Sequence, residues 1–76
     1  MASIRWLDPD GYDWRFELVD PEDNLIKAVV HNGKTKVRTV TYNGLEDLEE
    51  KIQEMFQDQI IEDFDDVLLK IDEMSS

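Results

Sequence analysis

Hydrophobic and polar residues alternate along residues 1–43, which is the pattern of β-strands that bury one face. Turn-forming residues interrupt the alternation three times, with Asp-Pro segments at residues 8–11 and 20–23 and an Asn-Gly pair at residues 32–33. The pattern therefore predicts an antiparallel β-meander of four strands. Their predicted ranges are Ser3–Leu7, Tyr12–Val19, Leu25–His31 and Lys34–Tyr42.

The turn residues also predict how these strands pair. A Pro-Asp-Gly segment is typical of a three-residue hairpin loop that ends on a left-handed residue, here Gly11. We expect a loop of the same length at residues 21–23, with Asp23 left-handed, and a two-residue loop at residues 32–33. The predicted pairs are Ile4–Phe16, Trp6–Trp14, Phe16–Ala28, Glu17–Lys27, Leu18–Ile26, Ala28–Val37 and Val30–Thr35.

This register assigns the side chains to two faces of the sheet. The inward face is predicted to carry Ile4, Trp6, Trp14, Phe16, Leu18, Ile26, Ala28, Val30 and Val37. The outer face is predicted to be basic, with Arg5, Arg15, Lys27, His31, Lys34, Lys36 and Arg38 beside Asp13 and Glu17. It also carries a predicted apolar strip, formed by Leu7, Val19, Leu25, Val29, Val40 and Tyr42.

Residues 44–74 change to a helical period. Two apolar stripes follow one another here, and the second is rotated roughly a quarter-turn or more from the first. They are Leu45, Leu48, Ile52, Met55 and Phe56, then Ile60, Ile61, Phe64, Val67, Leu68 and Ile71. We expect a break near residues 57–59, with Asn43 and Glu46 capping the first helix and Asp58 capping the second.

The sequence thus predicts an α+β fold in a single domain, residues 1–76. Its antiparallel sheet, residues 1–43, precedes an acidic helical segment, residues 44–74, that forms two amphipathic helices, or one kinked helix, packed on the sheet. The alternative is a fifth strand at Val67–Ile71, where apolar residues also alternate.

Charge is concentrated in the helical half. The 76 residues carry 19 acidic and 8 basic side chains, a net charge of −11, and residues 44–76 hold twelve of the acids and only two lysines. This charge opposes binding to nucleic acid or to anionic membranes. No apolar run approaches the roughly 18 residues of a membrane span, and the chain has no cysteine. We therefore expect a cytoplasmic protein.

Catalytic and metal-binding patterns are scarce. Without cysteine there is neither a thiolate nucleophile nor a thiolate metal site. Ser3, Ser75 and Ser76 lie near the chain ends, far in sequence from the single histidine, His31. The acidic run at residues 8–13 lacks the ligand spacing of an EF-hand. We expect no enzyme activity, no metal and no cofactor.

The acidic helices are the strongest functional signal. Acids recur every fourth residue from Glu46 to Asp66, although like charges at this spacing destabilise a helix by several tenths of a kcal/mol per pair. Stability alone would favour lysines among them. We therefore predict a partner-binding surface for the basic face of another protein. Its predicted residues are Glu46, Asp47, Glu50, Glu54, Asp58, Glu62, Asp63 and Asp66.

Carboxylates about 6 Å apart along a helix approximate the row of charges on a nucleic-acid backbone. In charge, size and composition the chain resembles the small acidic nucleic-acid mimics by which phages disable host or defence proteins. The resemblance implies a non-enzymatic inhibitor or modulator, monomeric or homodimeric, of a nucleic-acid-handling protein. The alternative is a structural, assembly or adaptor protein that uses the apolar strip. Nucleic-acid binding by the basic sheet face and adaptation to high salt are further possibilities.

Overall fold

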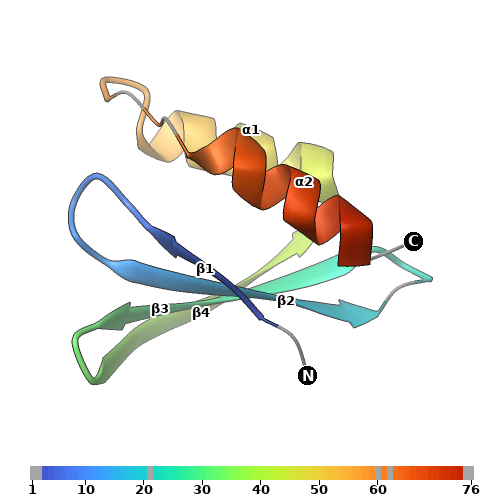
Figure 1. Ribbon diagram of the computed structural model, residues 1–76, viewed down its shortest axis with the longest axis horizontal. Coiled ribbons are helices and arrows are strands. Elements are labelled where there is room, and N and C mark those ends of the chain that lie inside the picture. The colour runs from blue at the N-terminus through green and yellow to red at the C-terminus, as the bar shows by residue number, and fades with distance from the viewer. Residues whose placement is uncertain (1–2, 21, 60, 62, 75–76) are drawn as a thin grey trace.

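The computed structural model describes residues 3–20, 22–59, 61 and 63–74. Four antiparallel strands, β1 (Ile4–Leu7), β2 (Asp13–Asp20), β3 (Leu25–Asn32) and β4 (Thr35–Asn43), form one sheet in the order β1-β2-β3-β4. Two helices, α1 (Leu45–Met55) and α2 (Phe64–Met74), follow and cover a single face of this sheet (Figure 1). The predicted α+β fold is confirmed, and the fifth strand considered at residues 67–71 is part of α2.

The first hairpin has the predicted loop and register. Trp6 pairs with Trp14, and Gly11 has the left-handed φ of +92°. The buried Asp8 carboxylate holds this hairpin together. Its Oδ2 accepts a hydrogen bond from the Trp14 indole N–H at 2.7 Å, and its Oδ1 accepts from the backbone N–H groups of Asp10 and Tyr12. The Asp8 side chain therefore links the first turn to the hydrophobic core.

The second hairpin keeps the predicted pairing but not the predicted turn. Leu18 pairs with Ile26 as expected, whereas the next pair is Asp20 with Leu25. Val19 is therefore an extra residue, and the left-handed position is Asn24 (φ 53°) instead of Asp23. The bulge compensates for the shifted turn, so the pairs Phe16–Ala28 and Glu17–Lys27 are also confirmed.

The third hairpin corrects the prediction for β4. Asn32 pairs with Thr35 across a loop of Gly33 and Lys34, and Val37 is an extra residue before Val30 pairs with Arg38. The predicted pairs Ala28–Val37 and Val30–Thr35 are therefore wrong. Beyond the bulge the register change also reverses the faces of β4, so Arg38, predicted on the outer face, lies on the helix side of the sheet. Val37 is exposed, Tyr42 is buried, and Val40 packs against the core.

The two helical stripes close the core over the sheet. Leu48, Ile52 and Phe56 from the first stripe are buried, as are Phe64, Val67 and Ile71 from the second, whereas Met55 is exposed. Trp6 lies at the centre, with its ring 4.9 Å from that of Phe64 and 5.8 Å from those of Trp14 and Phe56, measured between ring centroids. Ile60 lies outside the described residues.

The predicted helix caps are wrong in detail. Gly44 occupies the N-cap position of α1, and Asp47, not Glu46, reaches back to accept the backbone N–H of Asn43 at 3.0 Å. Asp58 lies in a turn after α1 and caps nothing, because α2 begins only at Phe64. The backbone carbonyl of Asp63 accepts a hydrogen bond from the backbone N–H of Val67. Asp63 therefore has the position at the start of α2 that was predicted for Asp58.

Candidate functional site

The exposed carboxylates of the helical half are the candidate site, and we call them the acidic layer. They lie on the side of α1 and α2 that faces away from the sheet, and in the turn between these helices. Its exposed members within the described residues are Glu46, Glu50, Glu54, Asp58, Asp63, Asp65, Asp66, Asp72 and Glu73.

The predicted partner-binding residues are distributed over three segments. Glu46, Glu50 and Glu54 form an exposed row on α1, and Asp66 is exposed on α2. Asp58 and Asp63 flank the break between the helices. The remaining two are not part of the exposed set, since Asp47 is half-buried and bonded to the Asn43 N–H, and Glu62 lies outside the described residues.

The predicted ladder of acids is not continuous. It required one helical path from Glu46 to Asp66, but α1 ends at Met55 and the chain turns back before α2. Figure 1 shows the two helices running side by side in opposite directions. The ladder is therefore reduced to a row of three acids on α1, with Asp58 in the turn and Asp66 on the neighbouring antiparallel helix α2.

Few cations compensate this surface. Lys70 lies 3.5 Å from Asp66 on the same helix. The side-chain carboxylates of Glu46, Glu50, Glu54, Asp58, Asp63 and Asp65 form neither a hydrogen bond nor an ion pair with any residue that the structure describes. Their charge is therefore directed into solvent.

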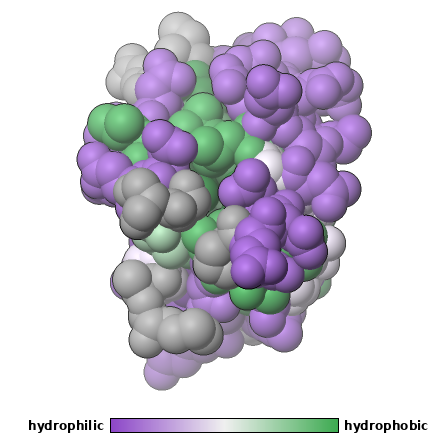
Figure 2. Space-filling model, turned by 90° about the vertical axis from the view of Figure 1, so that its right-hand side faces the viewer, coloured by the Kyte–Doolittle hydropathy of each residue, from purple (hydrophilic) through white to green (hydrophobic). Residues whose placement is uncertain are grey.

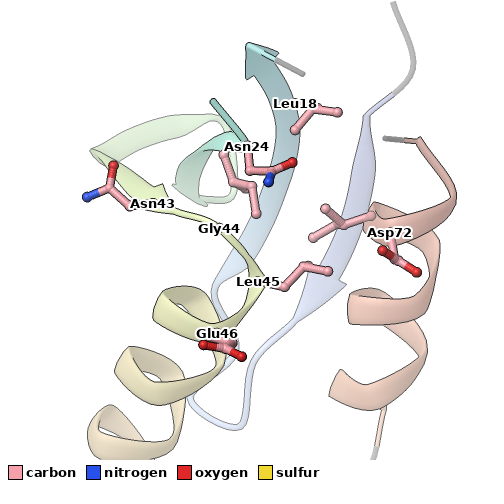
Figure 3. A pocket seen from close by; sticks show the side chains of 9 residues that line it. Leu18, Asn24, Asn43, Gly44, Leu45, Glu46 and Asp72 are labelled. Atoms are coloured by element: carbon pink, nitrogen blue, oxygen red, sulfur yellow. The ribbon is translucent and has the colours of Figure 1, made fainter. Parts of the chain in front are cut away.

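A hollow of about 400 Å³ opens at the end of the molecule where α1 begins. Figure 3 shows that its lining comes from the β2–β3 hairpin, the β4–α1 junction and α2. Leu18, Ile26, Leu45 and Ile71 supply apolar walls, and Glu46 and Asp72 add carboxylates. Figure 2, which faces this end, shows hydrophobic surface enclosed by hydrophilic residues.

The sheet face opposite the helices is uncovered (Figure 1) and carries four of the eight lysine and arginine residues. Register places Arg5, Arg15, Lys27, His31 and Lys36 on this face, with Asp13 and Glu17 between them. All seven aromatic side chains of the chain lie in the core or pack against it. The open face therefore lacks the stacking residues with which sheets bind single-stranded nucleic acid.

The predicted apolar strip on this face is broken up. Tyr42 and Val40 turn toward the helices, which removes two of its six members. Leu7 pairs with Asp13 at one end of the sheet, and Leu25 pairs with Asp20 at the other. Val19 lies beside Asp20 at the same end as Leu25, and Val29 lies between Arg15 and Thr39, so the predicted strip of six is not continuous.

Asp13 is the centre of a small ion-pair cluster on the open face. Arg5 Nη2 donates to Asp13 Oδ2 at 2.7 Å, and Arg15 Nη2 lies 3.7 Å from the same oxygen. The hydrogen bond from Arg5 lowers the pKa of the Asp13 carboxyl; partial burial opposes this, and the charges of Arg5, Arg15 and His31 add to it.

We expect Arg5→Gln to raise the pKa of Asp13 toward its ordinary value in an NMR titration of the carboxyl carbon. Because the folded pKa lies below the unfolded one, the cluster stabilises the fold above the unfolded pKa and loses this effect as pH falls through the folded pKa. An Asp13 titration that is unchanged in the variant would show that the hydrogen bond from Arg5 is not formed in solution.

Sequence reasoning missed a second feature, a groove of about 460 Å³ between β4 and α1. Arg38 crosses its end, with its guanidinium carbon 5.5 Å from the Trp14 ring centroid and its Nη2 3.3 Å from the Met55 sulfur. Burial raises the pKa of the Tyr42 hydroxyl in its wall, the charge of Arg38 lowers it and that of Asp47 raises it. The higher hydrophobicity of the even-numbered β4 residues, Val40 and Tyr42, was the available signal.

Comparisons with known proteins add no assignment, since no family model, curated protein or solved structure matches the chain. Among the described residues, no three potential metal-ligating side chains come together. In the same part of the chain, neither helix has the length and apolar character needed to cross a membrane.

Proposed function

We propose that this protein is a non-enzymatic inhibitor or modulator that binds a basic surface of a cytoplasmic nucleic-acid-handling protein through its acidic layer. One observation carries the proposal: within the described residues, the side-chain carboxylates of Glu46, Glu50 and Glu54 on α1 and of Asp65 on α2 form no ion pair, although pairing them would stabilise both helices. A surface that is maintained against its own repulsion is suited to a partner of opposite charge.

The geometry supports mimicry of a nucleic acid in particular. The α1 carboxylates Glu46, Glu50 and Glu54 follow one another at intervals of about 6 Å along the helix. The antiparallel α2 adds the exposed carboxylates of Asp65 and Asp66 near the end of this row, which extends the negative surface that a groove shaped for phosphates would meet. The hollow beside Glu46 offers apolar walls and carboxylates to a basic side chain of the partner.

Binding of this kind should depend strongly on salt. With the immobilised protein and a partner captured from its native host, we expect the affinity to fall at least tenfold between about 0.05 and 0.3 M salt. Duplex DNA should displace the protein from that partner. An affinity that is flat across this range, or a complex that DNA leaves intact, would overturn the proposal of an electrostatic mimic.

A further inference from the structure

The sheet has two edges of very different length. At one edge, β1 has four residues, whereas β4 at the other edge has nine, from Thr35 to Asn43. All of β4 except Val40 and Tyr42 is exposed, and among the described strands only β3 pairs with it. Half of its backbone N–H and C=O groups therefore face outward, which is a template for a further strand.

Apolar surface accompanies this edge. Five large hydrophobic side chains are exposed in the described chain, and two of them, Val37 (49%) and Met55 (43%), lie at the β4 edge or in the groove beside it. Val40 and Tyr42 form the rest of the apolar wall of the groove. A strand added to β4 would therefore gain both backbone hydrogen bonds and buried apolar area.

The two ends of β4 are flanked by charges of opposite sign. Lys34, Lys36 and Arg38 make its beginning basic, and Glu46 and Asp47 make the start of α1, directly after its end, acidic. An antiparallel neighbour of the same sequence would place its acidic end beside this basic end, and the two-fold symmetry repeats the contact. A parallel neighbour would instead align basic with basic.

We propose that β4 is a dimerisation edge at which a second copy of this chain adds its own β4 in antiparallel orientation. The two-fold axis passes between residues Thr39 and Thr41, the neutral centre of the strand. The dimer has one continuous eight-stranded sheet with all four helices on one face, so its two acidic layers point the same way. The inference does not depend on the proposed function, which a monomer could also perform.

Single cysteines test this geometry directly, because the natural chain has none. A two-fold axis at Val40 places Thr39 of one copy opposite Thr41 of the other, with their Cα atoms about 4.5–5.5 Å apart, inside the range of a disulfide. We expect an equimolar mixture of the Thr39→Cys and Thr41→Cys variants to form disulfide-linked dimers on mild oxidation, and either variant alone to form clearly fewer. Glu22→Cys, an exposed position in the β2–β3 turn, is the control and should remain largely monomeric.

Sedimentation velocity of the cysteine-free protein supplies the second readout. We expect a concentration-dependent monomer–dimer equilibrium, at least tenfold weaker in the double variant Thr39→Lys and Thr41→Lys, whose circular dichroism should match that of the wild type. A wild type that stays monomeric at several hundred micromolar would overturn the proposal. So would a double variant that dimerises as strongly as wild type, equal crosslinking of the Glu22→Cys control, or a β4 edge that pairs only with a foreign strand.

Discussion

Replacing Asp8 by alanine is expected to lower the free energy of unfolding by about 3 kcal/mol. The Asp8 carboxylate is only 6% exposed and accepts three hydrogen bonds, from the Trp14 indole and from two backbone N–H groups of the first turn. Hydrogen bonds to a charged group contribute about 1.5–3 kcal/mol, and a buried donor that loses its acceptor keeps the cost of its desolvation. In a chain of 76 residues, with roughly 4–11 kcal/mol of stability in all, this is a large fraction.

Urea unfolding followed by tryptophan fluorescence measures this change. Asp8→Asn is the informative companion: it keeps the size of the side chain, but its one amide oxygen can accept from Trp14 or from the turn N–H groups and not from both, so its NH2 group faces the remaining donors and it too should lose far more stability than a surface change. Asp23→Ala, an exposed change in the second turn, should alter stability by less than about 0.5 kcal/mol. If Asp8→Ala were as mild as Asp23→Ala, the Asp8 side chain would not join turn and core as described.

The first hairpin was predictable because its turn residues leave little choice. Pro9 and Gly11 specify the loop, and the pairing of Trp6 with Trp14 then agrees with the hydrophobic alternation. The role of Asp8 was not predictable, because it depends on where the Trp14 ring lies after the core has packed. Polar residues beside turns are normally exposed, so the sequence favoured a simple turn residue there.

In β4, the burial of apolar side chains outweighs the local preference of the turn residues and determines the register. The predicted two-residue loop would have turned residues 35, 37, 39 and 41 inward, three of which are threonines. Shifting the loop by one residue and adding the bulge at Val37 turns Val40 and Tyr42 inward instead. These two bury more apolar area than Val37 alone, and this gain exceeds the preference of Asn-Gly for the turn centre.

The acidic layer was predictable as a composition but not as a shape. Every exposed carboxylate of α1 and α2 follows from the helical period, since the apolar stripe must face the sheet. No proline or glycine lies between Phe56 and Asp63, so the sequence does not predict the length of the break between the helices. It follows from the need for α2 to reverse direction and cover β1 and β2, a tertiary requirement that local patterns do not contain.

Reversing the charge of the α1 row is expected to weaken partner binding by roughly 100-fold or more. Glu46, Glu50 and Glu54 are exposed, and their carboxylates form no hydrogen bond or ion pair within the described chain, so their replacement by lysine leaves the core intact. Each reversal exchanges an attraction for a repulsion, worth about 1 kcal/mol or more per site at a complementary interface. Three such sites together correspond to a loss of two or more powers of ten in affinity.

Net charge alone must be separated from the position of the charge. The matched control reverses Asp10, Glu22 and Asp23, three exposed acids in turns of the sheet half, and so produces the same change of net charge. The change in long-range electrostatic attraction to the partner is the same for both triple variants. The loss of direct contacts with the partner occurs only in the α1 variant. Unfolding curves of both variants should stay within about 1 kcal/mol of the wild type, because no buried group changes.

The most direct test of the acidic layer is therefore a comparison of three dissociation constants at about 0.15 M salt, for the wild type, the α1 triple variant and the sheet-half triple variant, against the same captured partner. We predict a loss of roughly 100-fold or more for the α1 variant and less than about fivefold for the control. Equal affinity of the α1 variant and the wild type, or an equal loss in both variants, would contradict the assignment of the acidic layer as the binding surface.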